Sequence, residues 1–250
     1  MQPHFIKARN LAEAWIKSLR AVMTHGIDYY VGYHYDIQTK DIPIIIHVEN
    51  PMEEPRVHDK APLKKAALDD YVKHLIHGLP EAEENEFDYT YHARLRCHWD
   101  CEVRKNMPNM LMNPEDIERK KQEICGGRCV VQQFDQVKQT IELLKQDPTL
   151  RKACMHTWMP LKDETEPDKH QPCLQMIQVR VNDGKLHFYV ILKSNDLFNA
   201  LPTNLIGFTA LQKYMADELN LDIGSYTQFS ISMHIYKDAF EIVNQILAEE

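Results

Sequence analysis

Residues 174–192 read LQMIQVRVNDGKLHFYVIL and carry the clearest fold signal in the chain. Apolar and β-branched residues recur through residues 174–181 and again through 186–192, which is typical of two strands. Between them, Asn182-Asp183-Gly184 predicts a tight turn, because Asp-Gly suits the positive φ angles of a hairpin. The stretch therefore predicts two antiparallel strands joined by a short connection.

Helical and strand patterns lie on both sides of this hairpin. Apolar residues spaced three and four apart predict helices over residues 8–24, 66–77, 134–146 and 205–219. Two further stretches, 42–48 and 228–236, read as strands. Together these patterns predict one α+β domain over residues 1–250, with a mostly antiparallel sheet and flanking helices.

Composition excludes several classes of protein. The net charge of -8 over 250 residues argues against a protein that binds a nucleic acid polymer, because phosphate binding needs excess Lys and Arg. No apolar run approaches the roughly 20 residues of a membrane span, and the N-terminus does not read as a signal peptide. We therefore expect a cytoplasmic protein whose six cysteines are reduced thiols.

Chemistry-bearing residues cluster in the second half of the chain. Cys173 follows Gln171-Pro172 at the start of the first hairpin strand, where a pocket can form, although a lone cysteine is more often a small buried hydrophobe. Residues 193–204 then read KSNDLFNALPTN, and His234-Ile235-Tyr236 lies further on. Upstream, Arg151-Lys152 precedes Trp158.

These motifs, in this order, resemble the folate-dependent thymidylate synthases. Members of that family carry Arg-Ser-x-Asp-x-x-x-Gly-x-Pro-x-Asn after a Pro-Cys nucleophile, and here Cys173 precedes Lys193 by twenty residues. The resemblance covers residues 134–236, whereas residues 1–130 are divergent. The pattern looks like the divergent archaeal members and implies a thymidylate synthase-like α+β fold.

The resemblance also implies roles for individual residues. Cys173 would be the nucleophile, since attack on carbon 6 of uracil needs a thiolate. Asp196 would act in catalysis and, with Trp158, face the pterin. Asn204 would bind the uracil edge, because an amide both donates and accepts. The residues implied to bind substrate are Arg151, Lys152, Lys193, Ser194, Asn204, His234 and Tyr236.

The implied reaction transfers a one-carbon unit to carbon 5 of dUMP, giving dTMP. The carrier would be 5,10-methylenetetrahydrofolate or methylene-tetrahydromethanopterin. The partner subunit of a homodimer would supply Arg151 and Lys152 to the substrate phosphate, where charge-assisted donors are needed.

Departures from the family pattern leave some roles open. Lys193 stands where the family has Arg and keeps the charge but not the bidentate fork. The family's acid/base Glu falls at Tyr71, with Asp70 beside it, so either residue is a candidate, and Tyr91 is a candidate for positioning a catalytic water. Only fourteen residues follow Tyr236, where the family continues into a closing tail, so we expect a remodelled carrier pocket.

Other interpretations stand beside these. Asn204 could cap a helix, His234 and Tyr236 could be core residues with polar tips, and Arg151-Lys152 could be a solvated pair. At the level of function, a pyrimidine nucleotide hydroxymethylase and a non-catalytic nucleotide-binding homodimer remain alternatives. The cysteine pairs Cys97-x3-Cys101 and Cys125-x3-Cys129 could hold zinc, but we expect no metal, since two intervening residues are the commoner spacing.

Overall fold

A computed structural model describes most of the chain. The described residues are 2–31, 37–63, 65–79, 87–96, 98–101, 115, 119, 122–123, 131–159, 163–164 and 170–250. The strands are β1 (His4–Ala8), β2 (Ile27–Val31), β3 (Ile37–Val48), β4 (His98–Cys101), β5 (Val131–Phe134), β6 (Cys154–His156), β7 (Leu174–Asn182), β8 (Lys185–Asp196) and β9 (Asp222–Tyr236). The helices are α1 (Leu11–His25), α2 (Lys65–His77), α4 (Tyr91–Arg96), α7 (Gln136–Gln146), α9 (Leu201–Glu218), the 3-10 turn η1 (Lys237–Ala239) and α10 (Phe240–Ala248).

Seven strands form the main sheet. Its order is β1-β3-β9-β8-β7-β6, with β2 paired to β3, while β4 and β5 form a separate pair. The pairings β1·β3 and β8·β9 are parallel, and the other four in the main sheet are antiparallel. The parallel β8·β9 pairing needs a long crossover, which α9 provides. The prediction of a mostly antiparallel α+β sheet is confirmed.

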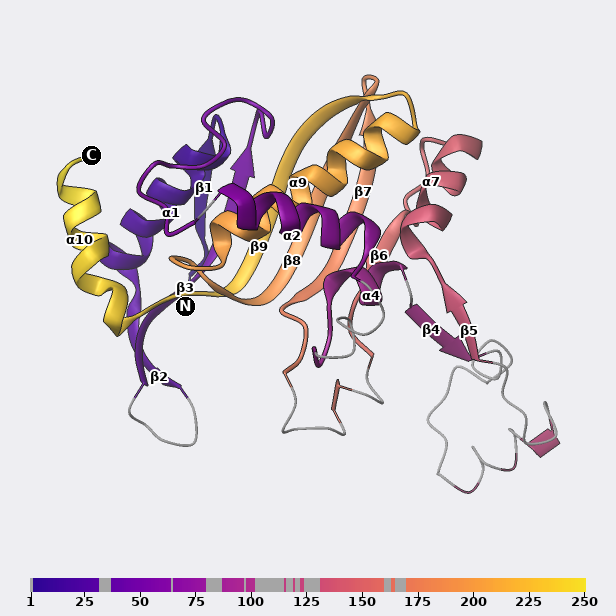
Figure 1. The fold of residues 1–250 in the computed structure, drawn as a ribbon, viewed down its shortest axis with the longest axis horizontal. Helices are drawn as coiled ribbons and strands as arrows, with labels where there is room; N and C mark the ends of the chain where they lie inside the picture. The colour runs from indigo at the N-terminus through magenta and orange to yellow at the C-terminus, as the bar shows by residue number, and fades with distance from the viewer. Residues whose placement is uncertain are drawn as a thin grey trace.

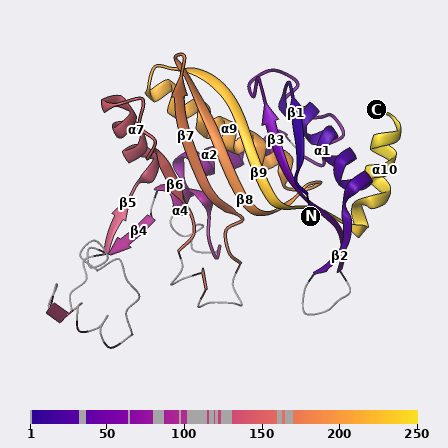
Figure 2. The same cartoon turned by 180° about the vertical axis from the view of Figure 1, so that it is seen from behind.

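Helices cover one face of this sheet. Figure 1 shows α9 and α2 lying across β7, β8 and β9, with α1 beside β3. Figure 2 shows the same strands from behind, and no described helix lies in front of β7, β8 or β9 there. The fold therefore has one helix-covered face and one open face over these three strands.

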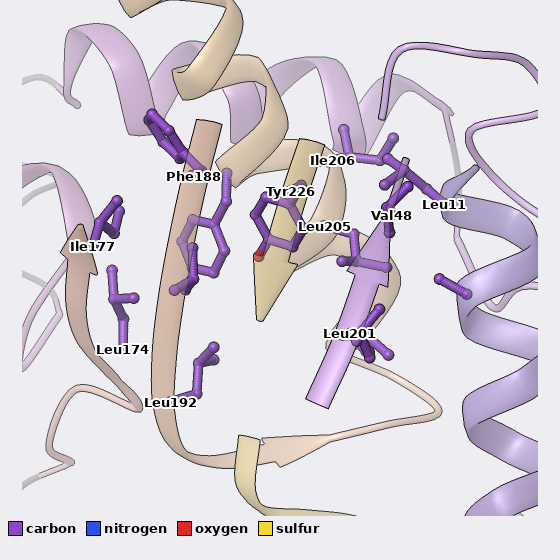
Figure 3. Close-up of a cluster of buried hydrophobic side chains, with 14 of the residues drawn as sticks. Leu11, Val48, Leu174, Ile177, Phe188, Leu192, Leu201, Leu205, Ile206 and Tyr226 are labelled. Carbon is purple, nitrogen blue, oxygen red and sulfur yellow. The ribbon is translucent and has the colours of Figure 1, made fainter. Parts of the chain in front are cut away.

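The core lies between the sheet and α9. Phe188 from β8 and Tyr226 from β9 are fully buried, and Leu201 and Leu205 of α9, four residues apart, pack toward them (Figure 3). Tyr189, whose side chain points to the opposite face of β8, is 41% exposed. The alternation along β8 thus separates the core from the open face.

The predicted elements are present, with corrected boundaries. The helix predicted from residue 8 begins at Leu11, because His4–Ala8 pairs with β3 and Asn10 accepts a hydrogen bond from the Glu13 N–H at 3.0 Å. The predicted 134–146 helix begins at Gln136, with Asp135 as its N-cap. The predicted 205–219 helix begins at Leu201. Pro202 is tolerated in the first turn because an N–H group there has no acceptor within the helix, so its absence costs no hydrogen bond.

The hairpin turn and the end of α2 are as predicted. Asp183 and Gly184 have φ values of 49° and 70°, as a turn of this type requires. Gly78 ends α2 with φ 83°, and the ring of His92 fills the space where a side chain would project. Another residue at position 78 would therefore be strained and would also collide with α4.

Two features of the sequence lie at the limits of what the structure describes. Cys97, Cys125 and Cys129 fall outside the described residues, and Cys101 is described only as part of the β4 backbone. Within the described part of the chain, no three potential metal ligands come together. None of the described helices combines the length and hydrophobicity that crossing a membrane requires.

Candidate active site

The sheet topology brings the predicted site residues to one end of three strands. Cys173 immediately precedes β7, and because β7 runs antiparallel to β8, its start lies beside the end of β8. Strands β8 and β9 are parallel, so their ends also coincide, and Asp196 is the cross-strand partner of His234. Residues separated by sixty positions in the sequence thereby share one sheet edge.

Irregular strand pairing marks this end of the sheet. The register shifts between Leu174 and Met176 on β7 and between Ile42 and Ile44 on β3. Such irregularities bend a strand and re-aim its side chains. They explain why side chains near the strand ends depart from simple alternation.

The Cys173 thiol lies in a polar setting. Its Sγ is 3.3 Å from the Ser194 Oγ, and its carbonyl accepts the Lys193 N–H at 2.9 Å. The side chain is half-buried, so the thiol is neither sealed in the core nor fully exposed. The geometry is compatible with a nucleophile that a substrate can reach.

Two tyrosines border the thiol. The Tyr91 hydroxyl accepts the Leu174 N–H at 3.3 Å, and the Tyr89 ring lies 5.8 Å from the Tyr91 ring, centroid to centroid. Burial raises the pKa of both phenols. Both hydroxyls therefore remain protonated at neutral pH and can serve as hydrogen-bond donors beside the thiol.

Asn204 lies inside α9 and is held by two neighbours. The Tyr71 hydroxyl donates to its Oδ1 at 3.4 Å, and its Nδ2 donates to the Asn195 Oδ1 at 3.1 Å. The N-cap residue of α9 is Ala200, so the interpretation of Asn204 as an N-cap is wrong: its side chain instead bonds Tyr71 of α2 and Asn195 of β8.

The structure places the two candidates for the acid/base group, Tyr71 and Asp70, on different sides of α2. Tyr71 is partly buried and packs against Gly207 of α9, and this burial raises its pKa far above the ordinary value, so it stays protonated. Asp70, one residue earlier, lies on the solvent side of α2 with 64% of its side chain exposed, 3.7 Å from the Lys73 Nζ. The structure brings Tyr71 to Asn204 and leaves Asp70 outside the cluster.

His234 and Tyr236 project together from the end of β9. Their rings meet edge to face with centroids 5.0 Å apart. Burial raises the Tyr236 pKa, and the nearby Asp196 and Cys173 contribute to the rise. Ser232, two residues before His234, donates to the buried Asp41 of β3.

The Asp196 carboxylate shapes the turn into α9. Its Oδ1 accepts the N–H groups of Phe198 and Asn199 at 3.1 and 3.0 Å, and its Oδ2 accepts the Asn199 side-chain amide at 2.9 Å. These bonds are typical of an Asx turn. Asp196 therefore has a structural task in addition to the cofactor role that the resemblance implies.

Lys193 and Trp158 contact each other. The Lys193 Nζ lies 5.1 Å from the centroid of the Trp158 ring and donates to the Gln171 Oε1 at 3.3 Å. The Trp158 indole N–H donates to Glu164 at 3.4 Å. The attraction between the ammonium group and the ring face helps to fix the position of the Lys193 side chain.

A buried ion pair anchors the segment that leads to Cys173. Arg94 of α4 and Asp163 form a two-pronged pair at 2.8 and 2.6 Å, and their side chains are only 4% and 2% exposed. Asp163 also accepts the Met159 N–H at 2.7 Å, and its carbonyl accepts the Gln171 amide. The pair thus links α4 to Met159 and to Gln171, which lies two residues before Cys173.

Arg151 and Lys152 lie away from this cluster within the chain. Both are exposed, and the Arg151 carbonyl accepts the Gln178 side-chain amide at 2.7 Å. Gln178 is five residues along β7 from Cys173, a distance of about 16 Å at the usual rise of a strand. The two cations therefore do not reach the thiol of their own chain.

Three residues of the cluster were not singled out from the sequence. Asn195 lies inside the KSND motif, and its polarity in a buried strand position was a usable signal. Tyr89 lies two residues before Tyr91 in the YTY stretch and could have been paired with it. Asp41 enters only through the β3·β9 register, in which it opposes His234, and no local pattern shows this.

Several known proteins are similar to this chain in sequence. The thymidylate synthase family model matches residues 78–250. A provisionally named thymidylate synthase of Methanosarcina acetivorans is 28% identical over 243 residues, covering 97% of this chain and 94% of that protein. A likewise provisionally named protein of Methanocaldococcus jannaschii is 30% identical over 249 residues, covering 98% and 96%.

A more distant relative matches a shorter part of the chain. The thymidylate synthase of Zymomonas mobilis is 35% identical over 122 residues, which are 48% of this chain and 40% of that protein. The family match covers the part of the chain that holds Cys173, Ser194, Asn204 and Tyr236. The chain belongs to the thymidylate synthase family.

Proposed function

We propose that this protein transfers a one-carbon unit from a reduced methylene-pterin to carbon 5 of dUMP, giving dTMP. One observation carries the proposal: the half-buried Cys173 thiol lies at a sheet edge beside Ser194, within a cluster that includes Asn204, Tyr91 and Tyr236. A nucleophile, a base-reading amide and polar hydroxyls are the groups that this chemistry needs in one place.

The proposed steps use these residues in turn. The Cys173 thiolate adds to carbon 6 of the uracil ring, and the electron pair moves to carbon 5 and the ring carbonyl. Carbon 5 attacks the methylene group of the carrier and then loses its proton. The carrier leaves and returns a hydride to the exocyclic carbon, and the thiolate departs as the ring double bond reforms. Asn204 holds the uracil edge throughout.

The carrier belongs to the folate type that the family uses, and either methylenetetrahydrofolate or methylene-tetrahydromethanopterin fits the proposal. Trp158 and Asp196 are the residues that we propose to face its ring. An indole offers a flat stacking surface, and a carboxylate suits the amino-pyrimidine edge of a pterin. We expect the reaction to take place in the cytoplasm.

A covalent adduct tests the proposal directly. The fluorine of 5-fluoro-dUMP cannot leave carbon 5 as a cation, so the ternary adduct with the enzyme and carrier should accumulate. Intact-mass spectrometry should show one nucleotide and one carrier bound per chain, and Cys173→Ala should abolish the adduct. The absence of an adduct with both carriers would contradict the proposed chemistry.

Product analysis then separates the methyl from the hydroxymethyl outcome. With dUMP as substrate, capture of the exocyclic methylene by water rather than hydride adds one oxygen atom to the product. Mass spectrometry of the nucleotide distinguishes the two. Tight dUMP binding without release of the carbon 5 proton would instead indicate a nucleotide-binding protein that is not an enzyme.

We also propose that the active form is a homodimer. The distance of Arg151 and Lys152 from their own Cys173 supports this, because they can serve a phosphate only in a partner's site. The open face of β7, β8 and β9, which carries the 41% exposed Tyr189, provides a surface for a second copy. Two open sheet faces can pack against each other in a two-fold dimer.

Subunit mixing tests this arrangement. Cys173→Ala chains and Arg151→Ala/Lys152→Ala chains should each be inactive alone. After the chains are mixed and exchanged, half of the dimers contain one intact site, so about a quarter of the wild-type activity should return. No recovery, despite demonstrated exchange of subunits, would contradict shared sites.

A further inference from the structure

Base discrimination by an asparagine depends on how its amide is turned. Uracil offers a carbonyl acceptor and a ring N–H donor, whereas cytosine offers an amino donor and a ring nitrogen acceptor. One side-chain amide carries both an acceptor and a donor, and turning it by 180° exchanges them. Asn204 could therefore pair with either base, and its neighbours must determine which orientation it presents.

The structure shows two such neighbours. Tyr71 lies on the Oδ1 side of the Asn204 amide at 3.4 Å, and Asn195 lies on the Nδ2 side at 3.1 Å. Asn204 and Asn195 are 9% and 3% exposed, so water does not compete freely for these bonds. The amide is consequently held at both ends within the protein.

Tyr71 does not distinguish the two orientations. A phenolic hydroxyl both donates and accepts, so it can bond whichever atom of Asn204 faces it. In the orientation that Asn195 has here it does distinguish them, because it presents its Oδ1, which only accepts and therefore requires the Nδ2 of Asn204. The orientation of Asn204 therefore follows from the atom that residue 195 presents.

The two amides form a coupled unit. The Asn195 Nδ2 is buried and has no hydrogen-bond partner among the described residues. If Asn195 turned, its Nδ2 would face Asn204, and Asn204 would have to turn as well to offer its Oδ1. The atom that residue 195 presents from β8 thus sets the orientation of the Asn204 amide in α9.

We propose that Asn195 is the residue that determines specificity for uracil over cytosine, acting as a positioning residue for Asn204. This inference rests on the proposed binding of a pyrimidine nucleotide at Asn204. The proposal assigns uracil recognition to the orientation in this structure, in which Asn204 Nδ2 faces the Asn195 Oδ1. An acceptor at position 195 is the feature that preserves it.

Binding measurements test the inference separately from catalysis. Calorimetry should give dissociation constants for dUMP and dCMP with the wild-type protein, Asn195→Asp and Asn195→Leu. Asn195→Asp keeps an acceptor of the same shape and should retain the preference for dUMP. Asn195→Leu removes the acceptor and should lower that preference about tenfold, the value of one well-placed hydrogen bond.

Controls separate positioning from general damage. Asn244→Leu, at an exposed asparagine of α10, should leave both constants unchanged. Thermal unfolding of each variant reports whether the fold persists, and Asn195→Ser serves as the second variant if Asn195→Leu does not fold. A serine hydroxyl donates as well as accepts, so this variant should also lose preference.

The outcomes distinguish the inference from the function on which it rests. If the folded wild-type protein binds neither nucleotide, the proposed function fails and the inference fails with it. If the wild-type protein prefers dUMP but folded Asn195→Leu and Asn195→Ser keep the same ratio of dissociation constants, only the inference is overturned. Loss of preference in Asn195→Asp as well would also overturn it.

Discussion

The ring of Tyr71 lies directly against the backbone of Gly207, so that a β-carbon added at Gly207 would overlap the Tyr71 Cε1. Gly207 is buried within α9, one turn beyond Asn204, and its bare backbone lets α2 approach closely enough for Tyr71 to reach that amide. The packing of α2 against α9 therefore determines whether Tyr71 can bond Asn204, the residue that we propose to bind the base.

Gly207→Ala should therefore displace Tyr71. A glycine in an unobstructed helix gains about 1 kcal/mol of stability on mutation to alanine, but overpacking here should cost about 1–3 kcal/mol instead. Urea unfolding should show this loss, and the KM for dUMP should rise as the Tyr71–Asn204 bond opens. In a Tyr71→Ala background the same mutation should cost much less, and equal costs in both backgrounds would contradict the contact.

Tyr71 and Asp70 should respond differently to mutation. Tyr71→Phe removes the donor that holds Asn204, so dUMP binding should weaken by about tenfold, the value of one hydrogen bond. Asp70→Asn changes an exposed residue and should alter neither binding nor stability by more than about 0.5 kcal/mol. A larger loss of activity in Asp70→Asn than in Tyr71→Phe would show that Asp70, rather than Tyr71, belongs to the active site.

Removing one partner of the buried pair Arg94–Asp163 should destabilise the fold more than removing both. Arg94→Met leaves the Asp163 carboxylate buried without its charged partner, which typically costs about 3–5 kcal/mol. Arg94→Met/Asp163→Leu removes both charges and should recover most of that stability in urea unfolding. If the double variant is as unstable as the single one, the packing of these two side chains, rather than their charges, stabilises the segment that leads to Cys173.

The sequence predicts that Cys173 and Ser194 lie close together, but it does not predict the contacts between distant strands or between α9 and the sheet. Cys173 and Ser194 were placed by motif spacing, and the hairpin that pairs β7 with β8 makes their proximity a local consequence. The start of α9 was placed four residues late, because Pro202 hides a first turn that the apolar period does not show. The position of Asp41 depends on the register between β3 and β9, and the contact of Asn195 with Asn204 depends on how α9 packs on β8; a local pattern can show that Asn195 is unusual but not what it contacts.

His187 should make the fold sensitive to acid. Burial lowers its pKa below 6.5, with Lys185 and His47 adding like-charge repulsion, and its Nδ1 accepts the Ser225 N–H at 3.0 Å. The unfolded chain therefore binds a proton at His187 more readily than the folded one. The stability that neutral His187 contributes to the free energy of unfolding is complete above pH 6.5 and is lost as the pH falls below it. His187→Gln should flatten the decline in unfolding free energy measured by urea titration between about pH 5 and 7. His74→Gln, at an exposed histidine of α2, is the matched control, and an unchanged slope in His187→Gln would show that other groups cause the decline.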